Sequence, residues 1–294
     1  MADVGDRSYR LSHAKRWLPV LAPIIGSALA LAALFRLIDV GAAREAVGSA
    51  DQLPVAGAAL LGLPYALLKS WKWRRLAVRA IPEATYVQAV RSYLIGVAAS
   101  LVTPGRLGEL TRAACFPRRR KELLALTVAD KFIDVGVLCV LCAAAAWSYS
   151  PRLGLLALAG ITLAVGVVWY ARRRQYPLAN RLRVALPARE IAANAAVSTA
   201  CYLLLATQFH LVLSSTGTTP AEVSFSAVPP IVLGSSMPLF FSGFGSREAI
   251  AVALLGAHGI SAERATVAGL LLFAVCTPLP ALAGIALAAL PRSR

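Results

Sequence analysis

The chain has 294 residues, of which 58% are hydrophobic and only 15% charged, whereas soluble domains carry about 25% charged and about 45–50% apolar residues. This composition indicates an integral membrane protein and argues against a soluble domain. The formal net charge of +16 would suggest nucleic acid in a soluble chain, but the basic residues cluster between apolar runs. They therefore predict membrane orientation and lipid contact, with no nucleic-acid partner.

Six apolar runs are long enough to cross a hydrocarbon core of about 30 Å, which takes about 17–25 helical residues. In chain order they lie at residues 18–38, 53–71, 123–146, 153–170, 190–213 and 265–290. The first follows basic residues, as a signal peptide does, but it is long for one and further spans follow. We expect it to be retained as a span.

The run 86–116 is broken by the sequence TPGRLGELTR at positions 103–112. Pro104 ends the entering helix and Gly105 permits a tight reversal, so the chain is expected to restart as a helix near Arg106. Charge at membrane depth costs about 2.5–3.5 kcal/mol per residue on insertion scales. Irregular backbone at that depth also needs cover from protein or a polar cavity. The motif therefore predicts a polar site within the bilayer.

The run 223–256 has a second interruption, FSGFGSRE, which ends in an arginine and a glutamate. Its glycines supply the break, and Ser246 is expected to cap the restarting helix. The residues expected to bind a lipid headgroup come from both motifs: Gly105, Arg106, Gly108, Glu109, Arg112, Gly245, Ser246, Arg247 and Glu248.

The two motifs have the chemistry of an anion site. The first N–H groups of a helix lack intrahelical partners and attract anions, and the guanidinium fork suits phosphate oxygens. Glu109 and Arg112 are three apart and share one helical face, so they can pair. If the two restarts meet, Arg106 and Arg247 form a cationic pocket flanked by Glu109 and Glu248. The alternative is that each arginine pairs with a carboxylate only to neutralise itself and fix the helix break.

The span 123–146 carries Asp130, Lys131 and Asp134 near its start. The two aspartates are four apart and share an inward face, where they support an arginine, carry protons or line the path. Cys139 and Cys142 form a CxxC inside the same apolar run, without a second pair or a nearby histidine, which favours packing over a metal site. We expect no metal and no cofactor.

Charge sets the topology, because lysine and arginine mark the cytoplasmic side. Basic clusters lie at residues 7–16, 69–79, 118–121 and 172–189. All four share one side if the run 86–116 enters the membrane and turns back. The terminal Arg292 and Arg294 also lie on that side if the run 223–256 enters the membrane and turns back.

Four tryptophans near predicted span ends are expected in an interfacial belt: Trp71, Trp73, Trp147 and Trp169.

The predicted fold is a single all-α polytopic membrane domain over residues 1–294. It has six full transmembrane helices and two oppositely oriented re-entrant helical hairpins, at 86–116 and 223–256, as an inverted repeat. Both termini are expected in the cytoplasm, and the protein in the cell (inner or plasma) membrane.

These motifs resemble a known family. The sequence from Pro104 to Glu109, followed by Arg112, is similar to the signature of the lysylphosphatidylglycerol synthase transmembrane region, also called the flippase-like domain family. Residues 243–248 resemble its later Gly-rich Arg–Glu motif. Residues 130–134 resemble its acidic-basic pattern, with Asp-Lys where Glu-Arg is expected. The resemblance covers roughly residues 50–290 and implies a membrane domain that moves lipids or lipid-linked headgroups between leaflets. The synthases carry a further soluble aminoacyl-transfer domain, so we expect no synthase activity here.

The expected function is therefore a lipid flippase, rather than an enzyme, that moves a phosphate-containing lipid with an anionic or zwitterionic headgroup. One alternative is a membrane enzyme that transfers a group to or from a lipid phosphate, with Glu109, Asp130 or Asp134 as base or metal ligand. Another is an accessory subunit of envelope assembly that does not transport.

Overall fold

The computed structural model describes residues 39–103, 106–116, 118–160, 186–236 and 245–289, together with positions 32, 36, 162 and 243. All regular secondary structure in this part of the chain is helical. Most of the predicted span 18–38, the second half of 153–170, the basic residues 172–185 and Gly105 lie outside it.

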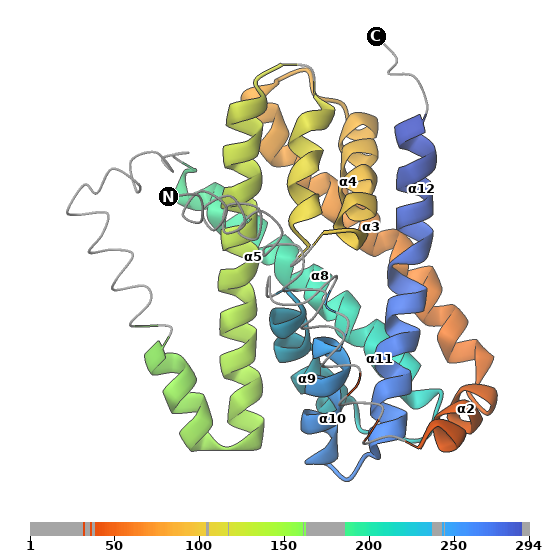
Figure 1. The fold of residues 1–294 in the computed structure, drawn as a ribbon. Coiled ribbons are helices and arrows are strands. Elements are labelled where there is room, and N and C mark those ends of the chain that lie inside the picture. The colour runs from red at the N-terminus through yellow and green to blue at the C-terminus, as the bar shows by residue number, and fades with distance from the viewer. Residues whose placement is uncertain are drawn as a thin grey trace, which may run out of the picture.

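The helices follow the predicted runs closely (Figure 1). In chain order they are α2 (Val40–Gly48), α3 (Gln52–Ala80), α4 (Tyr86–Leu101), the 3₁₀ helix η1 (Leu107–Cys115), α5 (Arg120–Tyr149), α8 (Ala188–Ser214), α9 (Ala221–Ser235), α10 (Ser246–Gly256), α11 (Ala262–Cys276) and α12 (Pro278–Ala289). Residues 151–160 are also helical. Within the described ranges, three helical segments are long and apolar enough to cross a membrane: α3, α8 and the run Ala262–Ala289. An all-α membrane protein is thus confirmed.

Each interrupted run forms two helices that pack against each other. The pair α4 and η1 lies in the upper half of Figure 1, and the pair α9 and α10 lies in the lower half. Helix α5 has 30 residues, about 45 Å at 1.5 Å per residue, and it contacts both η1 and α9. One long helix therefore connects the two pairs.

Prolines break the helices of this protein at some positions and not at others. The prolines at 229 and 230 stay inside α9, and the break falls after Ser235. The run 265–290, predicted as one span, is two helices that meet at Thr277. Pro278 follows that residue directly and Pro280 comes two positions later, and neither has a backbone N–H with which to continue the hydrogen-bond ladder.

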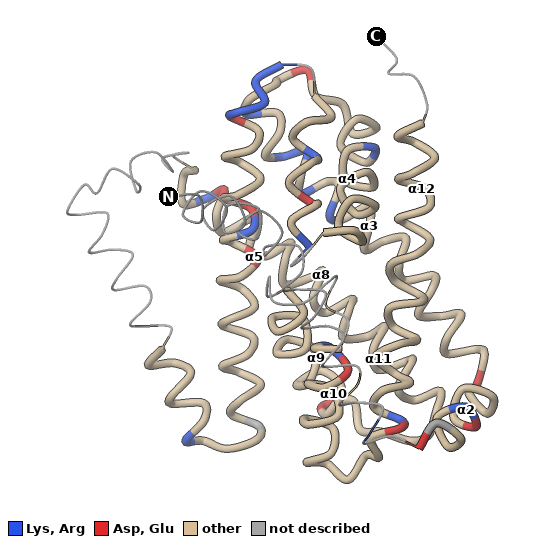
Figure 2. Tube along the Cα trace, in the orientation of Figure 1, with Lys and Arg blue, Asp and Glu red and all other residues tan. Residues whose placement is uncertain are grey.

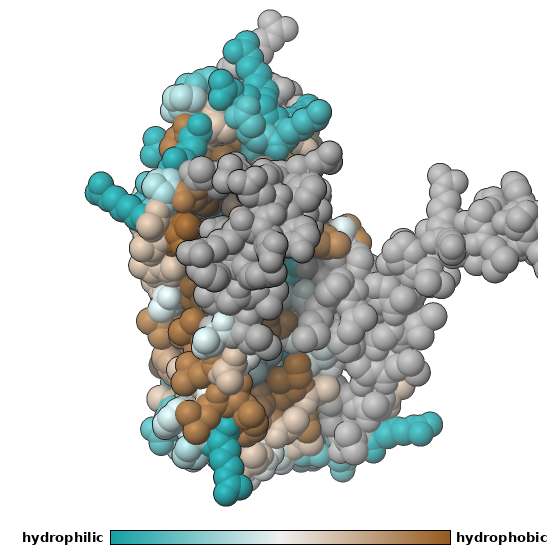
Figure 3. Space-filling model, turned by 90° about the vertical axis from the view of Figure 1, so that its left-hand side faces the viewer, coloured by the Kyte–Doolittle hydropathy of each residue, from teal (hydrophilic) through white to brown (hydrophobic). Residues whose placement is uncertain are grey.

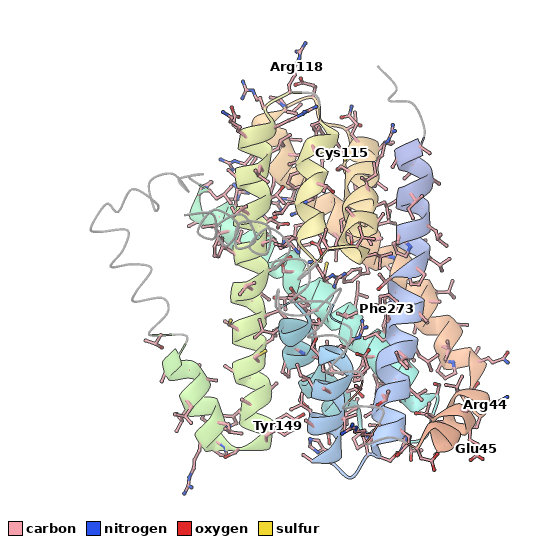
Figure 4. All side chains as sticks on the ribbon, viewed as in Figure 1. Arg44, Glu45, Cys115, Arg118, Tyr149 and Phe273 are labelled. Carbon is pink, nitrogen blue, oxygen red and sulfur yellow. The ribbon has the colours of Figure 1, made fainter. Side chains whose placement is uncertain are left out.

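The surface and the charges are distributed as a membrane protein requires. Figure 3 shows apolar side chains in a middle band between hydrophilic ends. Arg118 lies at one end of the molecule, and Arg44 and Glu45 lie toward the other (Figure 4). Several charged residues nevertheless lie in the interior of the upper half, beside α4 and α5 (Figure 2).

The predicted place of Trp73 in an interfacial belt is wrong. Its side chain is fully buried among Leu76, Phe116 and Leu123. Its indole N–H donates to Ser92 Oγ at 2.9 Å, and a buried indole N–H needs such a partner. Trp71 and Trp147 are exposed, as the belt requires.

Candidate functional site

The first hairpin turns at a tight approach between η1 and α4. A Cβ added at Gly108 would lie 2.3 Å from the backbone oxygen of Ala99, so only glycine fits. The Gly108 N–H donates to Thr103 Oγ1 at 2.7 Å. Arg106, just before η1, has φ 57, a left-handed conformation that costs a non-glycine residue roughly 1–2 kcal/mol. The turn thus holds an arginine at a position that favours glycine.

Arg106 belongs to a group that we call the outer network, together with Glu109 and Lys131. Arg106 Nε lies 3.6 Å from Glu109 Oε1, and Lys131 Nζ contacts Glu109 Oε2. The two cationic side chains are about one-third exposed, at 36% and 35%, whereas that of Glu109 is 17% exposed. Two accessible cations therefore share one carboxylate.

A second group, the inner network, lies deeper and consists of Lys69, Lys72, Arg112, Asp130 and Asp134. Lys72 Nζ lies 2.7 Å from Asp130 Oδ1 and 2.5 Å from Asp134 Oδ1. Arg112 Nη2 lies 2.6 Å from Asp130 Oδ2, and Lys69 Nζ lies 3.0 Å from Asp134 Oδ2. Lys72 and Arg112 are at most 4% exposed. These ion pairs connect α3, η1 and α5.

Further side chains complete this region. Ser198 Oγ donates to Asp134 Oδ1 at 2.6 Å, which adds α8 to the inner network. The Arg112 guanidinium lies over the Trp73 ring, 4.5 Å from its centroid, at a distance suited to a cation–π contact.

The second hairpin uses its charged pair differently. Glu248 is fully buried; its Oε2 accepts from the Gly245 N–H at 2.9 Å, and its Oε1 lies 3.0 Å from Arg247 Nε. Gly245 has φ 82, which suits glycine. Because Glu248 takes the free N–H, Ser246 lies inside α10 and donates to the Gly243 carbonyl at 3.1 Å. The prediction that Ser246 caps this helix is therefore wrong.

The starts of η1 and α10 point toward the middle of the molecule from opposite ends (Figure 1). Arg247 packs over the Phe273 ring at 4.9 Å from its centroid, and Phe273 lies between the two ends in Figure 4. Both helix starts therefore face the middle of the molecule, where Phe273 of α11 lies.

The sequence of this site matches one family. The family model of the lysylphosphatidylglycerol synthase TM region covers residues 20–284. The chain belongs to this family. The resemblance inferred from the two Arg–Glu motifs is confirmed, and membership indicates a membrane protein tied to lipid metabolism or transport. No curated protein matches the chain.

This member of the lysylphosphatidylglycerol synthase TM region family pairs its charges across helices. The pair of Glu109 with Arg112 that the spacing allows does not form, because α5 presents Asp130 and Lys131 at adjacent positions against η1. Arg112 contacts Asp130, and Glu109 contacts Lys131, so four charges find partners instead of two. Asp130 contacts Arg112, as the predicted support of an arginine requires.

Lys69 and Lys72 were not predicted as members of this site, because they fall in the basic cluster 69–79 that marks the cytoplasmic side. Their spacing of three places both on one helix face, and that was the available signal. Among the residues that the structure covers, no group of three His, Cys, Asp or Glu side chains is placed to hold a metal ion.

Proposed function

We propose that this protein is a lipid flippase that binds a phosphate-containing headgroup at the outer network. The observation that carries the proposal is that Arg106 and Lys131, each about one-third exposed, share the single carboxylate of Glu109. Membership of a lipid-related membrane family supports a lipid as the ligand.

The surroundings of the outer network also support a lipid. Leu107 and Phe132, the neighbours in sequence of Arg106 and Lys131, are 52% and 66% exposed, and Val102 is 70% exposed. Cations amid exposed apolar side chains suit a molecule with a charged head and apolar tails. The headgroup would contact Arg106 and Lys131 while the tails stay in the bilayer.

The proposed membrane arrangement is that of the sequence analysis. The pairs α4–η1 and α9–α10 are re-entrant hairpins that enter from opposite faces, and both termini are in the cytoplasm of a cell-membrane protein. The contact of Arg75 with Glu190 at 2.9 Å supports this, because it brings the basic end of α3 to the start of α8, near residue 189. Rocking of one repeat against the other would expose the site alternately.

Arg106→Gly tests the site, because glycine removes the cation and suits the left-handed backbone. In proteoliposomes, the rate at which a fluorescent phospholipid reaches the opposite leaflet should fall about tenfold or more. Arg119→Gly is the matched control: Arg119 also has positive φ and pairs with the glutamate three residues on, but the pair is exposed. Unchanged transport in Arg106→Gly would refute the proposed site. A new covalent lipid product would favour a membrane enzyme, and neither binding nor movement would favour an accessory subunit.

A further inference from the structure

The charges around the site do not balance. The outer network has two cations and one carboxylate, and the inner network has three cations and two carboxylates. Each network therefore carries one surplus positive charge. A surplus charge away from water is costly unless an opposite charge accompanies it.

The rest of the chain supplies little to balance this surplus. Of the 14 carboxylates in the sequence, only Asp3 and Asp6 lie outside the described ranges. The other nine described carboxylates lie elsewhere and are either engaged or exposed. Asp39 and Asp51 cap helices, and Glu263 is in the first turn of α11. Glu122 contacts Arg119, Glu190 contacts Arg75 and Glu248 contacts Arg247, whereas Glu45, Glu83 and Glu222 are exposed. The balancing anion is therefore expected from outside the protein.

The Nε atom of Arg112 also fits an anion from outside the protein. Arg112 is 3% exposed, and its Nε is a buried donor without a hydrogen-bond partner in the described part of the chain. A buried donor of this kind is rare in a complete structure. Asp130 Oδ1 also accepts no hydrogen bond there, but it lies 2.7 Å from the Lys72 ammonium, whereas Arg112 Nε has no such partner.

We propose, on the basis of the lipid-binding function proposed above, that this site selects lipids by headgroup charge and takes anionic headgroups over zwitterionic and cationic ones. A phosphodiester with no amine, as in phosphatidylglycerol, brings the missing negative charge. An added ammonium, as in phosphatidylethanolamine, cancels that charge. A lysyl group makes the headgroup cationic and places like charges together beside Arg106 and Lys131, which disfavours binding.

A competition experiment with the purified protein tests this without requiring transport. Equal amounts of phosphatidylglycerol, phosphatidylethanolamine and lysylphosphatidylglycerol with the same acyl chains are offered, and native mass spectrometry measures the bound ratios. Phosphatidylglycerol should exceed phosphatidylethanolamine by about tenfold, with the lysyl lipid weakest. A ratio near one would overturn the proposal, as would displacement of the lipid by glycerol phosphate at the same concentration as phosphatidylglycerol.

Two substitutions with opposite effects on charge make the test specific. Lys131→Gln removes one cation and should lower the preference for phosphatidylglycerol several-fold, whereas Glu109→Gln removes a carboxylate and should raise it. General loss of structure cannot shift the ratio in opposite directions, so a shift in the same direction would overturn the proposal. If Glu109→Gln does not fold, an unchanged ratio in Lys131→Gln overturns it alone. Arg119→Gln is the control, and its ratio should match the wild type.

The flippase assay separates the two proposals. Selective binding of phosphatidylglycerol without movement in proteoliposomes would leave the charge selectivity standing and reject the flippase function. Movement of all three lipids at equal rates with equal binding would reject the selectivity and leave the flippase function standing.

Discussion

In the inner network, removal of a buried carboxylate should lower the stability of the fold more than removal of a buried ammonium group. Asp130→Asn leaves three cations and one carboxylate, and Arg112 loses its only carboxylate partner in the described structure, at 2.6 Å. Breaking a buried pair from one side costs about 3–5 kcal/mol. Lys72→Met leaves two cations and two carboxylates, because Asp130 keeps Arg112 and Asp134 keeps Lys69. We expect that change to cost about 1–2 kcal/mol.

The measurement is the midpoint of thermal unfolding in detergent, followed by tryptophan fluorescence. At about 2 °C per kcal/mol for a chain of this size, the midpoint should fall by about 6–10 °C for Asp130→Asn and about 2–4 °C for Lys72→Met. Glu122→Gln, in an exposed pair with a 59% exposed carboxylate, should change it by no more than about 1 °C. An equal fall in the midpoint for the two buried variants, or a larger fall for Lys72→Met, would refute the argument from unbalanced charge.

Two further predictions concern packing at the first hairpin. Gly108→Ala should lower the unfolding midpoint and slow lipid movement, because its Cβ would lie 2.3 Å from the Ala99 oxygen. Gly136→Ala is the control and should be neutral, because nothing lies within 4 Å of the added Cβ. Equal behaviour of the two variants would contradict the close approach. Trp73→Phe should destabilise the protein by about 1–2 kcal/mol, since it removes the hydrogen bond to Ser92 and weakens the cation–π contact; chemical denaturation checks this, and an unchanged midpoint would count against it.

The breaks at the two motifs were predictable because their causes are local, whereas the break at Thr277 was not predicted. Proline and glycine act through the backbone of a few residues, and the runs 86–116 and 223–256 each form two helices with the break at the motif. The 3₁₀ form of η1 was not predicted. Its nine residues pack closely on α4 through Gly108, and that contact is invisible in the local sequence.

The ion pairs were predictable only in part, because their partners are far apart in sequence. Lys72 contacts Asp134, 62 positions away, and a lysine at the end of an apolar run resembles one that reaches the interface. Glu109 and Arg112 have suitable spacing for a pair, but the choice between near and distant partners depends on which charges α5 presents. The sequence therefore predicted an arginine partner for Asp130 but missed Lys72, which contacts both aspartates, and Lys69, which contacts Asp134.

The sharing of α5 between the two hairpins has a mechanical consequence. Ion pairs join η1 to Asp130 and Lys131 of α5, so these two elements should move as one rigid body. Helix α9 also packs on α5, but it has no lysine or arginine, and its single carboxylate, Glu222, is exposed at the helix start. Without charged anchors, the α5–α9 contact is the natural plane of sliding when one half of the molecule shifts against the other.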